Sequence, residues 1–165
     1  MRITPYELDE NIFKLINKDW MLICANDGES ANAMTASFGG FGIFCFKEVC
    51  HIYVRPERYT FDLLEKNDTF SINFFNESYR DVLKFCGAKS GRDVDKIKEN
   101  NLTLDDINGT KIINEAKLSI VCGKMFATDI KKEDFCDMNA FDLIEKDDIS
   151  LHRMYIGEIK EIIKK

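Results

Sequence analysis

Short apolar runs separated by turn residues dominate the first part of the chain. Residues 20–25 form a continuous apolar run, which is typical of a fully buried strand. The turn residues Asn26-Asp27-Gly28-Glu29 follow, and their Asp-Gly pair predicts a hairpin. The chain returns through residues 32–38, which we interpret as a second strand rich in small and hydroxyl side chains. Three glycines within residues 39–42 then permit a bend or bulge.

Two further strands frame a short helix. Residues 49–54 are apolar enough for a buried third strand. Residues 69–75 alternate, with Phe and Ile at 70, 72 and 74 on one face and Ser and Asn on the other, which predicts a half-buried antiparallel strand. Between them, residues 61–66 have the apolar spacing of a helix, for which Thr60 is the candidate N-cap.

Helical patterns recur in the middle of the chain. Residues 76–85 predict a helix, with Gly87 as its C′ residue. Ser90 and Asp93 approximate a capping box and predict that a further helix begins there. The spacing of Thr103 and Asp106 resembles another cap.

The last third of the chain returns to strand character. Residues 112–113 and 118–126 are strand-like, residues 131–137 form a polar excursion of about one helical turn, and residues 154–163 predict a terminal strand. Short strands interrupted by a few helices indicate a mainly β barrel or sandwich with helices at its edge. We find no internal repeat and no linker, so we expect a single domain over residues 1–165.

Composition narrows the class of protein. The chain is 45% hydrophobic, and its net charge of −6 argues against general nucleic-acid binding. The six cysteines have no C-x-x-C spacing, so we expect no zinc site. The N-terminus lacks an apolar leader, which favours a reduced cytoplasmic protein. No apolar run approaches the ~20 residues of a membrane span, so we expect no membrane partner.

The segment Arg55-Pro56-Glu57-Arg58-Tyr59-Thr60 carries the clearest candidate chemistry. It lies between a predicted strand and a predicted helix, and Pro56 favours an extended Arg55. Free N–H groups at a helix N-terminus and two guanidinium groups nearby predict an anion site, best suited to a phosphate. The alternative is a surface turn whose arginines pair with Glu57 and Asp62.

Three motifs in this order resemble the flavin reductase-like, FMN-binding split-barrel family, and within it the flavoredoxin-type branch. They are Asn32-Ala33-Met34-Thr35-Ala36-Ser37 with the following Gly39-Gly40, Tyr53 to Thr60, and Phe85-Cys86-Gly87-Ala88-Lys89-Ser90-Gly91-Arg92-Asp93-Val94-Asp95-Lys96. The closing Met154-Tyr155-Ile156-Gly157-Glu158-Ile159 is similar to the last strand of the family. The resemblance runs from about Trp20 to the C-terminus.

The resemblance implies a six-stranded antiparallel split β-barrel with short helices that forms a homodimer, with FMN at each subunit interface. Main-chain N–H groups after the second strand would bind the N1–O2 edge of the flavin, and the turn at 55–60 would bind its phosphate. The resemblance assigns cofactor binding to Asn32, Met34, Thr35, Ala36, Ser37, Phe38, Arg55, Arg58, Tyr59, Thr60, Lys89, Ser90, Arg92 and Lys96.

Several of these side chains also have plain structural interpretations. Arg92 and Asp95 would form a surface ion pair. For Cys86 a buried inert thiol is favoured over a redox role, and His152 is either a proton donor or a structural residue. Phe38 stands where many relatives carry Trp, which removes an indole N–H.

The favoured function is an NAD(P)H-dependent flavin reductase or oxidoreductase. NADH or NADPH would transfer a hydride to the flavin N5, and the electrons would pass to oxygen, a metal complex or a partner protein. The alternative is a flavoredoxin-like electron carrier with bound FMN and a protein electron donor, for which the acidic surface suits a basic partner. A flavin storage module and a structural β domain with an anion-binding turn are further alternatives. The sequence assigns no catalytic residue.

Overall fold

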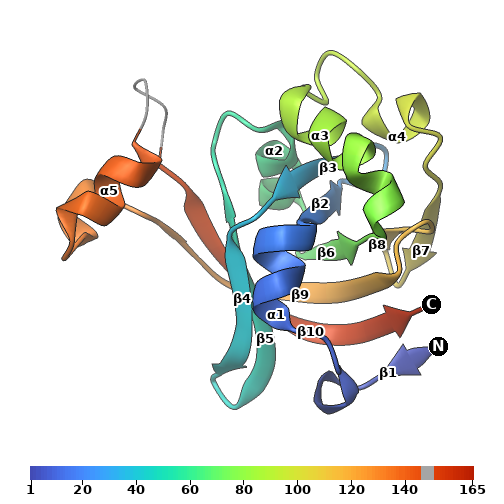
Figure 1. Ribbon diagram of the computed structural model, residues 1–165, viewed down its shortest axis with the longest axis horizontal. Coiled ribbons are helices and arrows are strands. Elements are labelled where there is room, and N and C mark those ends of the chain that lie inside the picture. The colour runs from blue at the N-terminus through green and yellow to red at the C-terminus, as the bar shows by residue number, and fades with distance from the viewer. Residues whose placement is uncertain (146–150) are drawn as a thin grey trace.

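The computed structural model describes residues 1–145 and 151–165, and most of its regular structure is antiparallel sheet (Figure 1). The strands are β1 Arg2–Ile3, β2 Met21–Asn26, β3 Ala31–Ala36, β4 Gly39–Phe44, β5 Lys47–Val54, β6 Thr69–Phe74, β7 Leu104–Ile107, β8 Thr110–Ile113, β9 Leu118–Asp129 and β10 Arg153–Lys164. Over the described residues, one eight-stranded sheet has the order β3-β2-β6-β9-β10-β5-β4, with β1 on β10, and β7 pairs only with β8. The fold class is as predicted, with more strands than the expected six.

The helices are short. They are α1 Ile12–Lys14, α2 Tyr59–Lys66, α3 Arg80–Ala88, α4 Lys96–Glu99 and α5 Met138–Ile144, with 3₁₀ turns at Pro5–Glu7, Glu77–Tyr79 and Lys132–Asp134 and a π-helical turn at Leu15–Asp19. Helices α2, α3 and α4 cover one end of the sheet, and all three contact β3 (Figure 1). None of the helices in the described ranges is long and apolar enough to cross a membrane.

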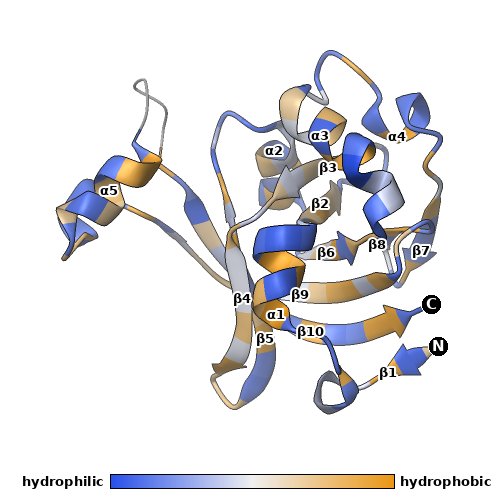
Figure 2. Cartoon of the chain, viewed as in Figure 1, coloured by the Kyte–Doolittle hydropathy of each residue, from blue (hydrophilic) through white to orange (hydrophobic). Residues whose placement is uncertain are grey.

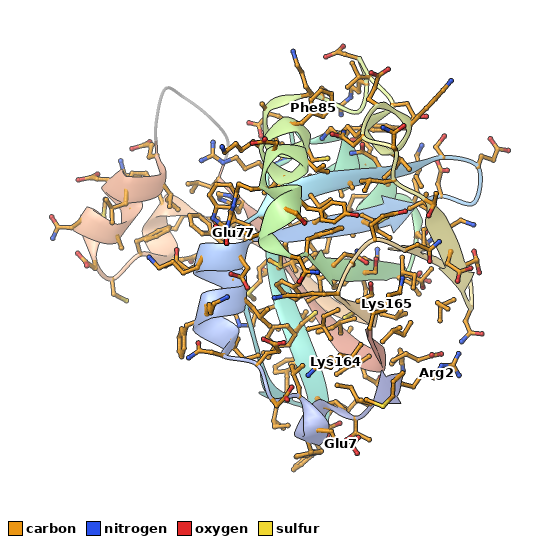
Figure 3. The ribbon with its side chains drawn as sticks, turned by 45° about the vertical axis from the view of Figure 1, so that its right-hand side comes forward. Arg2, Glu7, Glu77, Phe85, Lys164 and Lys165 are labelled. Carbon is orange, nitrogen blue, oxygen red and sulfur yellow. The ribbon has the colours of Figure 1, made fainter. Side chains whose placement is uncertain are left out.

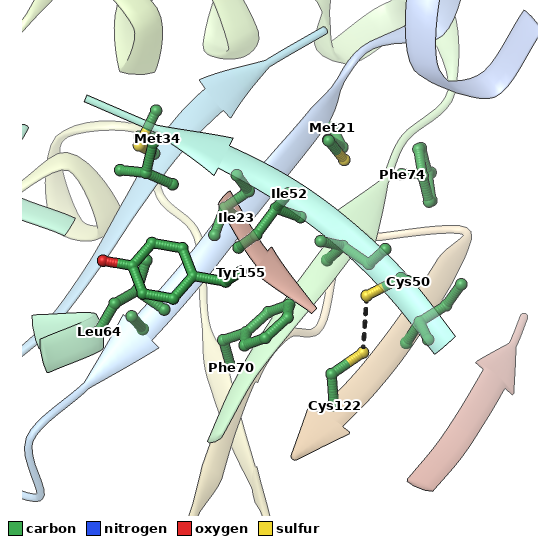
Figure 4. Close-up of a cluster of buried hydrophobic side chains, with 14 of the residues drawn as sticks. Met21, Ile23, Met34, Cys50, Ile52, Leu64, Phe70, Phe74, Cys122 and Tyr155 are labelled. Atoms are coloured by element: carbon green, nitrogen blue, oxygen red, sulfur yellow. Dashed lines mark hydrogen bonds between the residues drawn. The ribbon is translucent and has the colours of Figure 1, made fainter. Parts of the chain in front are cut away.

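The main hydrophobic core lies inside the curved sheet (Figure 4). Phe70, Ile52 and Tyr155 come from three different strands and are fully buried there. The thiols of Cys50 on β5 and Cys122 on β9 meet at 3.1 Å, although β10 separates the two strands in the sheet.

Gly157 on β10 makes room for this contact. A Cβ at this position would lie 2.8 Å from the Phe70 ring and 2.9 Å from the Cys122 Cβ. The strand therefore requires a residue without a side chain at the point where the core is tightest.

A second cluster fills the space between the outer face of β2–β3 and helix α3. It contains Leu22, Ala33, Leu83 and Cys86, so these two strands are buried on both faces. Full burial on both faces explains why residues 20–25 form a continuous apolar run rather than an alternating one.

The prediction that strand β6 is half-buried is wrong. The strand was expected to expose its polar face, but Ser71 and Asn73 are fully buried. The Asn73 amide donates to the Leu22 carbonyl (3.2 Å) and accepts from the Ser119 hydroxyl (2.8 Å), while the Ser71 hydroxyl donates to the Lys111 carbonyl (2.7 Å). Because the β7–β8 hairpin covers this face, polar residues there satisfy one another instead of meeting water.

The glycines at residues 39–42 permit a bend or bulge, but the chain is extended there. This segment is strand β4, which pairs with β5 through a tight turn at Cys45 and Phe46. Both turn residues have positive φ, 51° and 61°, which a two-residue hairpin requires and which non-glycine residues adopt rarely. The tip is apolar and exposed, with Ile43 and Phe46 64% and 102% accessible, and the end of β4 is coloured hydrophobic in Figure 2.

Three predicted helix boundaries are also wrong. Arg58, not Thr60, is the N-cap of α2, and Thr60 lies inside the helix. Gly87 lies within α3 rather than beyond its end. The helix predicted from Ser90 begins at Lys96, with the Asp95 side chain as its cap, because the intervening residues form turns. Thr103 and Asp106, whose spacing resembles a cap, lie instead immediately before β7 and within it.

Strands β9 and β10 extend beyond the barrel as a two-stranded arm that ends in α5 (Figure 1). Residues 131–137 contain the expected single helical turn, but α5 was not predicted. The chain ends lie together at the other side, where Arg2 pairs with Ile163 (Figure 3). The arm thus leaves the body of the protein close to the turn at residues 55–60, since Arg55 Nη2 donates to the Ile144 carbonyl at 3.2 Å.

Candidate functional site

The turn predicted to bind an anion connects β5 to α2. The Arg58 N–H donates to the Arg55 carbonyl (3.0 Å), and the Arg58 guanidinium donates to the carbonyl of Gly87 (2.8 Å). Burial, and secondly the charge of Arg55, lower the pKa of Arg58, although an arginine stays cationic at any physiological pH. Among the described residues, no carboxylate forms an ion pair with Arg58. Within the described residues, the half-buried Arg58 guanidinium thus donates to one carbonyl, and the neighbouring Glu57 charge partly opposes the lowering of its pKa.

A second buried cation comes from the start of α4. Lys96 is only 3% exposed, and its ammonium donates to the carbonyls of Ala33 (3.0 Å) and Cys86 (2.8 Å). Burial, with a smaller contribution from Arg58, lowers the pKa of Lys96 to about 8. An ammonium has three N–H donors, and within the described part of the chain the third has no acceptor and no carboxylate pairs with it.

These two cations line the same pocket. It has a volume of about 100 Å³ and draws its walls from β3, the turn before α2, the end of α3 and the start of α4. Its lining residues are Asn32, Met34, Glu57, Arg58, Tyr59, Thr60, Ala88, Lys89, Ser90, Gly91 and Lys96. The fold thus gathers most of the sequence-predicted cofactor residues into one place. We call this cavity the phosphate pocket, after the ligand that the sequence predicts for the turn at 55–60.

Thr60 and Asn32 fix the pocket wall rather than cap a helix. The Asn32 amide donates to the Thr60 hydroxyl (2.8 Å), and both side chains are buried, so β3 is tied to α2. Gly91 packs directly on this pair. A Cβ at Gly91 would overlap the Asn32 amide and lie 2.8 Å from the Tyr59 ring. Sequence reasoning did not single out Gly91, whose role depends on this tertiary contact.

The edge of β3 offers main-chain donors next to the pocket. β3 is the last strand on its side of the sheet. The Ala33 carbonyl faces away from β2, because it accepts from Lys96. The N–H and C=O of alternate residues in an antiparallel strand face the same side, so those of Thr35 also face outward. The Thr35 hydroxyl turns to α3, where it donates to the Leu83 carbonyl.

Arg92 lies outside the phosphate pocket. Its guanidinium donates to the Glu57 carbonyl (2.8 Å) and pairs with Asp62 (2.5 Å), rather than with Asp95. Its N–H also donates to the Ser90 hydroxyl (3.2 Å). Arg92 therefore braces the 55–60 turn from the solvent side.

Ser37 and Phe38 line a different cavity, of about 800 Å³ and mainly apolar. The Phe38 ring packs on His152, with centroids 5.6 Å apart. Burial, then the charge of Arg55, lower the pKa of His152 to about 4, so this imidazole is neutral at pH 7. Neither cavity is lined by Thr35, Ala36 or Arg55.

Two further side chains bear on the site. His51 borders the apolar cavity, and its Nδ1 is buried without a hydrogen-bond partner in the described residues. No motif in the sequence singles it out, because one histidine in an apolar strand carries no pattern. Cys86 is fully buried, and burial raises the pKa of its thiol, which disfavours the reactive thiolate.

The architecture defines a small antiparallel β protein with a pocket, lined by two cations, where three helices meet an edge strand. A comparison with known families matches residues 14–164 to the flavin reductase like domain. The chain therefore belongs to the flavin reductase-like domain family. No curated protein matches the sequence significantly.

Solved structures share the fold. A flavoredoxin from Methanosarcina acetivorans has a TM-score of 0.71 at 17% identity, with 100% of this chain and 75% of that chain covered. A flavoredoxin of Desulfovibrio vulgaris (Miyazaki F) has a TM-score of 0.70 at 16% identity, with 99% and 77% covered. A Streptomyces globisporus C-1027 NADH:FAD oxidoreductase has a TM-score of 0.66 at 14% identity, with 89% and 75% covered.

Proposed function

We propose that this protein binds FMN and is an NAD(P)H-dependent flavin reductase or oxidoreductase. The observation that carries the proposal is a pair of cations, the half-buried Arg58 and the buried Lys96, that line one pocket and form no salt bridge with a carboxylate of the described residues. Buried charges are normally paired, so two cations whose direct hydrogen bonds go to carbonyls favour an anionic ligand. Family membership makes a flavin phosphate the best candidate.

The donor set of the pocket fits a phosphate. Arg58 offers a planar guanidinium suited to two-point hydrogen bonding, Lys96 offers its third N–H, and Lys89 and Ser90 lie on the same wall. The N-terminus of α2 adds the positive end of a helix dipole. Tyr59 and Thr60 shape the pocket from the same helix.

The outward main-chain groups of β3 are the proposed binding edge for the flavin ring. Asn32 and Met34 join this strand to the phosphate pocket, and Thr35, Ala36 and Ser37 continue it towards Phe38. Bound FMN would supply hydride chemistry at its N5 atom, while these residues orient the ring and stabilise negative charge on it.

The FMN-binding protein can obtain its electrons in two ways, from a nicotinamide nucleotide or from a protein donor. The NADH:FAD oxidoreductase neighbour supports a reductase that takes electrons from NADH or NADPH. The two flavoredoxin neighbours support the alternative of an electron carrier with bound FMN and a protein electron donor.

We also propose a homodimer with FMN at the subunit interface. The exposed apolar tip of the β4–β5 hairpin supports it, because Phe44 packs at a tilt against the exposed Phe126, with centroids 6.1 Å apart, and together they form an apolar surface on β4 and β9. Such surfaces typically mark association sites.

The test is an absorption spectrum of the purified protein, before and after FMN addition, followed by anaerobic NADH or NADPH. Flavin bands that bleach rapidly support the reductase. Flavin bands that persist until a protein donor is added support the carrier. A protein that takes up no FMN would refute both.

A further inference from the structure

A separate cavity of about 320 Å³ lies between the N-terminal helical segment at residues 12–19, the turn before α3 and the residue that precedes β9. It shares no lining residue with the phosphate pocket or with the apolar cavity beside Phe38. Four cations and two acids line it and leave a formal charge of +2, in a chain whose net charge is −6. They are Lys14, Lys18, Arg80, Lys117, Asp19 and Glu77, and Figure 3 shows Glu77 next to the N-terminal helical segment. We call this cavity the cationic pocket.

Two of the four cations are paired within the pocket. The Asp19 carboxylate accepts from the Lys14 ammonium at 2.7 Å and forms an ion pair with Lys117 at 3.2 Å. Lys18 and Arg80 form no ion pair with a carboxylate of residues 1–145 and 151–165. One carboxylate therefore serves two lysines, and a lysine and an arginine are left for an anion.

Arg80 is held in place with most of its donors unused. Its guanidinium carbon lies 4.3 Å from the centroid of the Trp20 ring, and its Nη2 donates to the Lys18 carbonyl at 2.6 Å. A guanidinium has five N–H donors, and the part of the chain that the structure describes offers this one no other acceptor. Such a preorganised planar group suits two-point hydrogen bonding to a phosphate.

The backbone that builds this stack is unusual. Leu15–Asp19 form a π-helical turn, and Trp20 follows it with φ 66° and ψ 166°, a region confined almost entirely to glycine. π-helical turns and strained backbone of this kind are frequent at functional sites, and the strain persists only where surrounding contacts fix it. Here the backbone places the Lys18 carbonyl and the Trp20 ring against Arg80. The strain is thus located beside the group that is left for an anion.

The remaining polar residues of the pocket favour an anion that also carries hydroxyl groups. Asn76 is the N-cap residue of the turn before α3, but its side chain does not cap that turn. The Glu77 carboxylate repels a bare anion, whereas it accepts a hydrogen bond from a hydroxyl. The cavity has the size of small-molecule sites. A phosphate monoester carries close to two negative charges at pH 7, which balances the formal charge of the pocket.

We infer that the cationic pocket binds a small hydroxylated phosphate monoester of the sugar phosphate class. Arg80 and Lys18 bind the phosphate, and Glu77 and Asn76 bind the hydroxyl groups. The site is independent of the proposed function, because it has no residue in common with the phosphate pocket.

The test is a calorimetric titration of glucose 6-phosphate into the protein saturated with FMN. Saturation fills the phosphate pocket, so the heat reports on other sites only. We expect one site per chain with a dissociation constant below about 1 mM. The chain has a single tryptophan, so the indole N–H of Trp20 gives one resonance in a nitrogen–proton correlation spectrum. This resonance should shift on binding, because Arg80 stacks on the ring.

Variants separate the two parts of the ligand. Lys18→Gln keeps the main-chain carbonyl that holds Arg80, and it should weaken binding about tenfold, as should Arg80→Gln. Lys84→Gln is the matched control, because it removes the same charge from α3 but pairs with Asp81 outside the pocket. Glu77→Gln should reduce the preference for glucose 6-phosphate over inorganic phosphate about fivefold, because it weakens the hydroxyl acceptor and removes the repulsion of a bare anion.

The outcomes separate this inference from the proposed function. Absence of binding at this affinity, or binding that leaves the Trp20 resonance unmoved, overturns the inference. Equal effects of Lys18→Gln and Lys84→Gln also overturn it, because they indicate a general attraction to surface charge. Binding that FMN abolishes places the sugar phosphate in the phosphate pocket and overturns it as well. If the protein takes up no FMN, the proposed function fails, whereas the same titration without FMN still decides this inference.

Discussion

Arg58 and Lys96 owe their chemistry to what surrounds them rather than to their charge alone. Several cations of this chain have carboxylate partners at the surface, as Arg153 does with Asp129 at 2.7 Å. Arg58 and Lys96 have carbonyl partners instead, so each keeps unused donor capacity in a place with little water. Under these conditions a phosphate gains more from each hydrogen bond than it would at an exposed lysine.

Replacement of Arg58 tests its role in binding. We expect Arg58→Ala to weaken FMN binding by about 1.5–3 kcal/mol, the range for hydrogen bonds to charged groups. Isothermal titration would measure the loss, and circular dichroism would check that the fold persists. The control is Arg2→Ala, whose guanidinium is 72% exposed and pairs with Glu161 at the other end of the protein. An unchanged FMN affinity for Arg58→Ala would exclude this turn as the phosphate site.

The pKa of Lys96 predicts how FMN affinity changes with pH. Below its pKa of about 8 the buried ammonium attracts the phosphate, and as the pH rises through that value the charge is lost. We therefore expect FMN affinity to fall above about pH 8 in the wild type. A Lys96→Met variant should bind FMN more weakly at pH 7 and lack this fall. An identical pH profile in both proteins would contradict the role of Lys96.

The free energy of unfolding does not follow the same pH dependence as FMN affinity. The pKa of Lys96 is lower in the folded apoprotein than the ~10.4 of an unfolded lysine. The unfolded chain therefore binds more protons between these values, so this group makes the free energy of unfolding rise, not fall, with pH. A loss of affinity above pH 8 would thus not reflect loss of the fold.

The sequence predicts the side chains of this site better than their arrangement. Pro56 and the strand-to-helix order locate the turn, but they misplace Thr60, whose hydroxyl is taken by Asn32 from a distant strand. Lys96 becomes the first residue of α4 because Asp95 caps this helix, several residues after the predicted cap at Ser90. Contacts between segments far apart in the sequence decide the place of Thr60 and the burial of Lys96, and no local pattern encodes them.

At the scale of secondary structure, the strands follow the hydrophobic pattern closely. The hairpin at Asp27 and Gly28 forms as predicted, with Gly28 at φ 95°. The pattern fails for β4, whose glycines resemble a bend and whose turn lacks the usual Asn-Gly signal. It fails for β6 because a second hairpin covers the polar face, which alternation alone cannot reveal.

Because β10 lies close to the core at Gly157, we expect this position not to tolerate a larger residue. We expect Gly157→Ala to lower the free energy of unfolding by about 1–3 kcal/mol, the usual cost of overpacking, because its Cβ would meet the Phe70 ring. Urea denaturation would measure the change. Gly123→Ala is the matched control on the neighbouring strand, where the nearest atom, 3.1 Å away, belongs to the flexible Lys160 side chain. Equal stability of the two variants would contradict this packing argument.

At the scale of the whole molecule, the apolar hairpin tip predicts association. We expect light scattering to give twice the chain mass of 19.1 kDa. The double change Phe44→Asp and Phe46→Asp should shift the equilibrium to monomers, because charged side chains are costly to bury in an interface. Asp also tolerates the positive φ at position 46. Glu99→Lys on α4 is the control, and a wild-type protein that is purely monomeric would contradict the proposal.

The central claim is that the pocket of Arg58 and Lys96 binds the phosphate of a flavin. The most direct test compares the affinities of the apoprotein for FMN and for riboflavin, which differ only by that phosphate. We predict that FMN binds at least about tenfold more tightly, or 1.4 kcal/mol, and that Arg58→Ala removes most of the difference. Equal affinities for the two flavins would contradict the account.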